Sequence, residues 1–263
     1  MCLSFKNLDY NLAYTYFKLK DYNNASKYFQ KFIDNNSGDR LRRNDAYLRL
    51  ADGYFVSSKY QNAIDAYDKA IQINEIETDY AAFQKAMSNG YLGKGSTKIS
   101  ELNTFIDTYP KSALRDDAMY ELANSYVKSN DTDKAMQMYD RLNSEYKRGA
   151  FTSKALLRQG LVYYNANDNE RALTKFKKVA SDFPNSGEAV QAVSTARLIY
   201  IDLGRVDDYA AWVKSLDYVE VSDVELDNTM NLAAEKPYLE NDTENAIRQF
   251  NKYLNQFPNG IHA

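Results

Sequence analysis

The six residues NDTDKA at positions 130–135 return as NDNERA at 167–172 and as NDTENA at 241–246. The alanines that end the three copies, at 135, 172 and 246, lie 37 and 74 residues apart, so the copies share a period of 37 residues. Tyr209 lies one period after Ala172 and occupies the place of the missing copy. Self-similarity at a period of roughly 20–50 residues is typical of a solenoid or array of short units.

An aromatic residue marks the units at the same period. Tyr109, Tyr146 and Phe183 follow one another at steps of 37 residues, and Phe257 lies 74 residues after Phe183. Proline follows three of these four aromatic residues, at positions 110, 184 and 258. The shared turn and the shared aromatic mark therefore divide the chain into equivalent units.

Each unit predicts two helices joined by the shared turn. In the fourth unit, apolar residues recur at helical spacing on both sides of positions 130–135. They are Met119, Leu122, Ala123 and Tyr126 before the turn, and Ala135, Met138, Tyr139 and Leu142 after it. The aspartate and threonine of the turn are suited to cap the second helix. The alternation typical of β-strands fits these residues less well, so we expect antiparallel helix pairs.

The pattern Leu-Ala-x-x-Tyr, then eight residues, then Ala-x-x-x-Tyr-x-x-Ala resembles the tetratricopeptide repeat. The second unit carries it as Leu50, Ala51, Tyr54, Ala63, Tyr67 and Ala70. The resemblance implies an all-α fold, a right-handed superhelical α-solenoid of about seven helix pairs. It also implies that small residues lie where the two helices of a pair approach most closely. We expect Ala63, Ala135, Ala172, Ala246 and Gly160 at such places.

The seven predicted pairs form one solenoid over residues 1–263. They are placed at about 4–35, 43–74, 77–108, 113–146, 150–182, 187–216 and 223–257. The match is weaker in the third pair, where Lys98 or Ile99 takes the small-residue place, and in the sixth, where Tyr209 does so. Because terminal repeats normally need a polar capping face, and neither end shows one, we expect a fragment of a longer array.

The composition excludes several classes of site. The 33 Lys and Arg residues nearly balance 36 Asp and Glu residues, whereas a nucleic-acid binder shows a basic surplus. No apolar run approaches the ~20 residues that a membrane span requires. Cys2 and His262 are the only Cys and His residues, too few for a zinc site. We therefore expect neither cofactor nor metal nor enzymatic activity. Cys2 is interpreted as a boundary residue, not a lipoprotein cysteine, because no signal peptide precedes it.

The period of 37 residues and the Tyr/Phe-Pro-x-Ser link between units resemble the bacterial envelope branch of the family. Residues 203–216 also resemble a segment of long repeat proteins from Bacteroidetes-type bacteria. These resemblances imply a periplasmic or outer-membrane-associated scaffold for envelope assembly, secretion or motility. A cytoplasmic location, with the chain acting as a peptide-sensing regulatory receptor, is one alternative. An accessory domain of an enzyme is another.

In the family, the first helix of each pair lines the concave side of the superhelix. By register, that side is predicted to carry Tyr10, Tyr14, Phe17, Leu48, Asp52, Phe55, Phe83, Met87, Tyr91, Tyr120, Asn124, Leu157, Leu161 and Tyr164. Such a mostly aromatic groove suits a protein or peptide partner bound as an extended segment or a helix. The alternative is that several of these rings pack between neighbouring first helices.

Tyr10, Tyr14 and Tyr120 are expected to be the main anchors, because they should be least needed by the core between repeats. The family's carboxylate clamp uses Lys and Asn on successive first helices. Tyr10, Tyr14, Leu48 and Asp52 take those places here, so we do not expect binding of a chaperone tail.

Two further stretches admit a structural or a functional interpretation. Residues 217–227 contain five acidic side chains and no basic one. They could bind a basic partner, but a solvated connection before the next helix is the favoured interpretation. Gly90, Gly93 and Gly95 lack the spacing and the preceding strand of a phosphate-binding loop, so we interpret them as the turn within the third pair.

Overall fold

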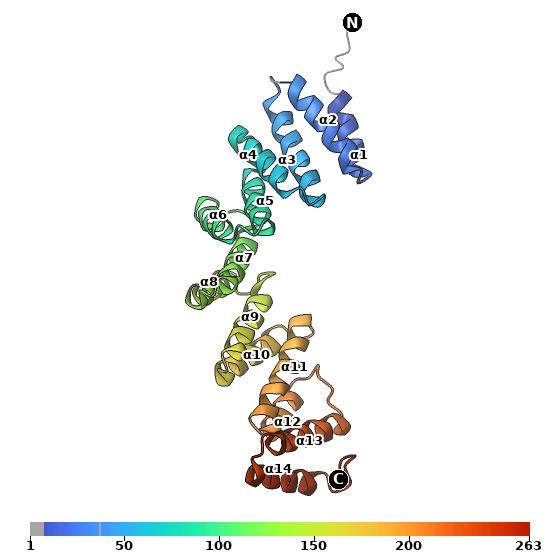
Figure 1. Cartoon of the computed structure of the whole chain (residues 1–263), viewed down its shortest axis with the longest axis vertical. Coiled ribbons are helices and arrows are strands. Elements are labelled where there is room, and N and C mark those ends of the chain that lie inside the picture. The colour runs from blue at the N-terminus through green and yellow to red at the C-terminus, as the bar shows by residue number, and fades with distance from the viewer. Residues whose placement is uncertain (1–7, 37) are drawn as a thin grey trace. The chain divides into compact units, whose positions relative to one another are not determined.

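The computed structural model describes residues 8–36 and 38–263, which contain fourteen helices and no strand (Figure 1). Cys2 and the first residues of the first predicted pair lie outside this part of the chain. The helices are α1 (Leu8–Lys18), α2 (Tyr22–Asn35), α3 (Arg40–Val56), α4 (Tyr60–Ile73), α5 (Thr78–Tyr91), α6 (Gly95–Thr108), α7 (Arg115–Lys128), α8 (Thr132–Glu145), α9 (Thr152–Asn165), α10 (Asn169–Asp182), α11 (Gly187–Asp202), α12 (Val206–Lys214), α13 (Asp223–Leu239) and α14 (Thr243–Gln256). The predicted all-α solenoid of helix pairs is confirmed; the right-handed superhelix stays a prediction.

The chain forms two compact units, residues 1–140 and 141–263, with the boundary inside α8. In the first unit, each helix from α1 to α6 packs on the one that follows it in the chain. In the second unit, α9, α10 and α11 pack in succession, and α13 packs on α14 and on α11. This pattern of contacts between sequence neighbours is how solenoid repeats bury their apolar faces.

The repeated stretch at 130–135 contains the turn that ends one helix and the first residues of the next helix. Asn130, Asn167 and Asn241 have φ values of 62°, 58° and 63°, a left-handed conformation that asparagine tolerates better than most residues. The next residue, an aspartate, caps the new helix: a carboxylate oxygen of Asp168 accepts a hydrogen bond from the amide of Arg171 at 3.2 Å. Asp242 does the same for Asn245 at 3.3 Å. The repeat therefore returns because each pair needs this local turn.

Small side chains are buried at the expected places in the second, fourth, fifth and seventh pairs, as the resemblance implies. Ala63, Ala135 and Ala172 are fully buried, and Ala246 is almost so. At Gly160, an added Cβ would stand 2.4 Å from Cε1 of Phe176. Real Cβ atoms do not approach another heavy atom so closely, so the glycine is required by the packing.

In three of the pairs, a polar side chain binds the link that follows the pair. Oδ1 of Asn44 in α3 accepts a hydrogen bond from the amide of Glu75 at 2.8 Å. In α5, Asp79 accepts one from Oγ of Ser112 at 2.6 Å. Asp227 in α13 accepts one from the amide of Ile261 at 2.8 Å. In all three cases a residue of the first helix holds the link after the second helix.

Replacing Ala135 by leucine should destabilise the protein by ~1–3 kcal/mol, because three extra carbons must enter a contact that has no free space. Thermal unfolding followed by circular dichroism measures the change. Gln137→Leu places the same side chain at an exposed position of α8 and should leave the transition within a degree or two of wild type. Equal midpoints for Ala135→Leu and wild type would contradict the assigned register.

Candidate binding groove

Three of the residues predicted to face a partner belong to the core. Leu48 is 0% exposed, Phe83 5% and Leu157 6%. Leu48 packs in the same cluster as Phe29 and Phe32 of the preceding pair. Side chains so deeply buried cannot contact a partner without unfolding, so their assignment to an accessible surface was wrong. The alternative interpretation, packing between neighbouring helices, is the one the structure supports for them.

Tyr10 and Tyr14 join the first pair to the second. Their hydroxyls donate hydrogen bonds to Oδ2 of Asp45 in α3 at 2.6 and 2.5 Å. Their rings also pack on Phe29, with centroids 6.2 and 5.4 Å away. Burial, together with the neighbouring Asp45 carboxylate, raises the pKa of both tyrosines, so both stay protonated donors. The expectation that the core needs these two rings least was wrong.

A charged network continues from Asp45 along the same face of α3. The guanidinium of Arg49 donates to Asp45 at 3.3 Å, to Asp52 at 2.8 Å and to Glu77 at 2.7 Å. Asp52 also accepts hydrogen bonds from the hydroxyls of two further tyrosines, Tyr67 and Tyr80, each at 2.8 Å. Burial raises the pKa of both tyrosines. Asp52 is thus a buried acceptor within the repeats and not a groove residue.

Arg49, which lies at the centre of this network, was not among the residues predicted from the sequence. The available signal was the spacing of Asp45, Arg49 and Asp52, since residues four and three positions apart share a helix face. Opposite charges at these spacings predict ion pairs on that face. The spacing within α3 does not predict that four tyrosines donate hydrogen bonds to the two aspartates, because those tyrosines lie in three other helices.

Several predicted groove residues pair with the ring 15 residues later in their own repeat. Asn124 accepts a hydrogen bond from Tyr139 at 2.6 Å, as Asp52 does from Tyr67. Leu161, which has no acceptor, packs in the cluster that contains Phe176. The two residues that have an oxygen, Asp52 and Asn124, thus bind the hydroxyl of the tyrosine 15 positions later. The remaining rings are half-buried: Phe17 packs on Tyr22, Tyr120 on Tyr139, and Tyr164 against the second unit's core.

Three of the predicted residues do line one accessible groove. Met87 and Tyr91 of α5 and Asn124 of α7 border a cavity of about 580 Å³ between the third and fourth pairs. Tyr91 is 59% exposed. Its ring stacks on Tyr60 at 4.9 Å and meets the edge of Phe55 at 5.5 Å, so it is held in place while its outer surface stays open.

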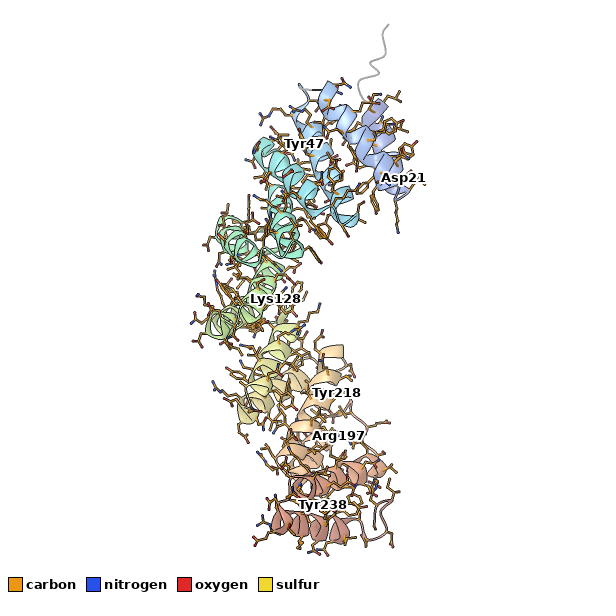
Figure 2. All side chains as sticks on the ribbon, in the orientation of Figure 1. Asp21, Tyr47, Lys128, Arg197, Tyr218 and Tyr238 are labelled. Carbon is orange, nitrogen blue, oxygen red and sulfur yellow. The ribbon has the colours of Figure 1, made fainter. Side chains whose placement is uncertain are left out.

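Two lysines also line the groove. Nζ of Lys98 lies 2.6 Å from Glu121, whereas Lys128, labelled in Figure 2, is exposed at the end of α7. The lining thus carries two lysines and one glutamate. Lys98 is the residue that occupies the small-residue place of the third pair, so the departure from the repeat pattern is what brings a charge to this position.

The glycines at 90, 93 and 95 shape the rim of this groove. They form the predicted turn: α5 ends at Tyr91 and α6 begins at Gly95. Gly93 has a φ of 75°, which few other residues adopt. A Cβ at Gly90 would stand 2.7 Å from Cδ of Lys98 and would displace that side chain. The absence of a side chain at Gly90 therefore lets Lys98 reach Glu121.

The described residues were compared with the requirements of a metal centre and of a membrane span. Across residues 8–36 and 38–263, no cluster of three or more His, Cys, Asp or Glu side chains is arranged to hold a metal ion. None of the helices there combines the length and the apolar character that crossing a bilayer requires. What the groove offers chemically is an aromatic surface, a thioether and cationic side chains.

Comparison with known proteins agrees with the repeat. Models of the tetratricopeptide repeat match residues 10–75, 117–148 and 154–186. The search of curated proteins finds no match to this chain.

Solved structures show the same fold at low identity. A tetratricopeptide repeat protein from Parabacteroides merdae is similar over 94% of this chain and 91% of its own, with a TM-score of 0.61 and 15% identity. YrrB, a TPR protein described as having an unusual peptide-binding site, is similar over 69% of this chain and 88% of its own, with a TM-score of 0.53 and 16% identity. The apo form of the quorum sensor NprR from B. thuringiensis covers 96% of this chain and 88% of its own, with a TM-score of 0.56 and 13% identity. Residues 10–75, 117–148 and 154–186 are therefore tetratricopeptide repeats, and the chain is an all-α solenoid built from such helix pairs.

Proposed function

We propose that the chain is a non-catalytic interaction scaffold that holds a segment of a protein or peptide partner in the groove between its third and fourth helix pairs. The observation that carries the proposal is the groove of about 580 Å³ in which Met87 and Tyr91 meet Asn124 from the next first helix. Tetratricopeptide repeats generally serve protein binding, and one structural neighbour is described as peptide-binding. Both points support a peptide-like ligand.

The lining of the groove favours a segment that carries an aromatic or aliphatic side chain beside a carboxylate. Tyr91 offers a large rigid surface that loses little conformational freedom on binding, because Tyr60 and Phe55 already hold it. Lys128 is exposed, and no described residue forms an ion pair with it. A carboxylate of the partner can therefore pair with Lys128 without breaking an existing contact.

Tyr91→Ala should weaken partner binding by ~2 kcal/mol, about thirtyfold in Kd, if Tyr91 is an anchor of the kind that dominates interfaces. The experiment is affinity capture from the native extract, with each captured protein quantified, followed by titration of the purified partner. Lys128→Glu should weaken the same partner, and more so at low salt.

The matched control is Tyr238→Ala, which removes a tyrosine of similar exposure from the second unit and should leave capture unchanged. Circular dichroism verifies that the helical content of each variant equals that of wild type. Equal recovery of every partner by the wild type and by Tyr91→Ala would reject the groove as the binding site.

We also propose that the scaffold works in a bacterial cell envelope, on the periplasmic side of the outer membrane. The support is the resemblance of the 37-residue period and of the Tyr/Phe-Pro-x-Ser link to the envelope branch of the family. Fractionation of cells that express the chain from its complete reading frame tests this. Recovery in the cytoplasmic fraction would overturn it and would favour the peptide-sensing alternative.

A further inference from the structure

The second unit contains a pocket that the proposed function does not use. It has a volume of about 480 Å³ and lies between α11, α12 and the connection that leads into α13. Ligand pockets usually measure about 300–1,000 Å³, so the size suits one or two side chains of a bound segment. Figure 2 labels Arg197 and Tyr218, two of the residues that line it.

One wall of the pocket is formed by α11, which contributes three aliphatic side chains together with Ser194 and Arg197. Val190 is 61% exposed and Leu198 51%, whereas Val193, which also lines the pocket, is buried in the core. The opposite wall is the connection, whose Val219 and Val221 pack with one side against the core. Aliphatic side chains on both walls suit an aliphatic side chain between them.

Three hydrogen bonds hold the walls in place. The hydroxyl of Tyr218 donates to the carbonyl of Ala180 at 2.8 Å and so fixes the connection to α10. Nε of Arg197 donates to Oγ1 of Thr229 at 2.7 Å. The amide of Glu225 donates to Oγ of Ser222, the residue that caps α13, at 3.1 Å. A pocket held in this way needs little ordering when a ligand enters.

The charge of the pocket is acidic. Glu220 and Glu225 line it together with a single cation, Arg197. Neither glutamate forms an ion pair with another described residue. The residues from 217 to 225 add Asp217 and Asp223 and contain no lysine or arginine. Tyr209 of α12 also lines the pocket. Burial and then the charge of Glu225 raise the pKa of Tyr209, whereas Arg197 lowers it.

We propose that this pocket binds a peptide segment in which an aliphatic side chain is flanked by lysine or arginine. The aliphatic side chain lies between Val190, Leu198 and the valines of the connection. The flanking cations pair with Glu220 and Glu225. The site differs from the groove of the first unit, whose lysines favour a partner carboxylate, and it does not depend on that groove.

The test uses fluorescein-labelled synthetic peptides and anisotropy measurements with the full chain at low ionic strength. The probe is the peptide KVKLK; EVELE has the opposite charge and KSKSK lacks the aliphatic side chains. Glu220→Gln with Glu225→Gln should weaken KVKLK binding about fivefold or more, because both charges that face the cations are removed. The control pair, Glu240→Gln with Glu244→Gln, removes the same charge at exposed positions and should change binding less than twofold.

Leu198→Ser tests the apolar wall and should also weaken KVKLK binding about fivefold. Binding of KVKLK in preference to both other peptides, lost in the pocket variants alone, supports the proposal. Three results overturn it: no saturable binding of KVKLK, equal loss in the pocket and control pairs, or equal binding of KSKSK. Circular dichroism on every variant establishes that the fold is retained, and glutamine keeps the size of each replaced side chain.

Discussion

Replacement of Asp52 by alanine is expected to destabilise the first unit by about 3–5 kcal/mol, because it removes one partner from a buried charged network. Asp52 is 9% exposed and accepts hydrogen bonds from Tyr67 and Tyr80 through Oδ1 and from Arg49 through Oδ2, each at 2.8 Å. Without the carboxylate, buried hydroxyl donors lose their acceptor and cannot return to water. Urea unfolding and hydrogen exchange over α4 and α5 measure the loss.

Two further variants separate the acceptor from the charge. Asp52→Asn keeps one carbonyl oxygen for the tyrosines and should cost less than Asp52→Ala. Asp65→Ala removes an exposed aspartate from α4 and should leave exchange in α4 and α5 nearly unchanged. Equal protection of these helices in wild type and Asp52→Ala would show that the network contributes little to stability.

The pH dependence of the same variants has a definite sign. Burial raises the pKa of Asp52 above its ordinary value, although the tyrosine hydrogen bonds and Arg49 lower it. The folded state therefore holds this proton more tightly than the unfolded state. The stabilising contribution is fully present below the unfolded pKa of about 3.9 and is lost as pH rises through the folded pKa. As pH rises from the unfolded pKa to the folded pKa, the wild type should therefore lose free energy of unfolding relative to Asp52→Asn, because asparagine does not titrate.

The repeat could be predicted from the sequence because the turn that defines it depends only on residues close together in the chain. The left-handed Asn130 and the capping Asp131 act within a few residues of each other, and so do Asn167 and Asp168. Lys20, Ser58 and Gly93 adopt the same backbone conformation in other pairs without the Asn-Asp signature. In those pairs the apolar spacing alone predicted the helices.

The candidate site was harder to predict because every first helix has neighbours on more than one side. Helical spacing shows that Leu48, Phe55 and Tyr91 share a register, but not which neighbour covers them. Leu48 is buried by the preceding pair, whereas Tyr91 remains exposed beside the glycine turn. Such burial depends on residues about one period away, so it could be found only in the folded chain.

The acidic residues between 217 and 227 also show that burial is hard to predict from the sequence. Residues 217–227 were expected to be a solvated connection, and Asp217, Glu220 and Asp223 are exposed. Asp227, however, is buried and accepts a hydrogen bond from Tyr253 at 2.7 Å, so the expectation was wrong for that residue. Composition alone cannot separate an acid that faces solvent from one that holds a neighbouring helix.

The close helix contact of the fifth pair depends on the chemistry of a single ring. In the second and fourth pairs, the tyrosine at this place donates its hydroxyl to Asp52 or Asn124. Phe176 has no hydroxyl and instead lies against Gly160, where an added Cβ would meet Cε1 at 2.4 Å and Cδ1 at 2.7 Å. Phe176 is fully buried and so cannot move aside without displacing its neighbours.

Gly160→Val is therefore expected to destabilise the second unit by about 3 kcal/mol, at the upper end of the usual cost of overpacking. Urea unfolding, with hydrogen exchange over α9 and α10 as the local readout, measures the effect. Gly187→Val is the matched control: this glycine also lies in a helix, but no heavy atom stands within 4 Å of its added Cβ. Combining Gly160→Val with Phe176→Leu should recover part of the loss, because the smaller side chain vacates the space that valine needs. If Gly160→Val and Gly187→Val unfold at the same urea concentration, the helices of the fifth pair do not approach as closely as the Phe176 contact requires.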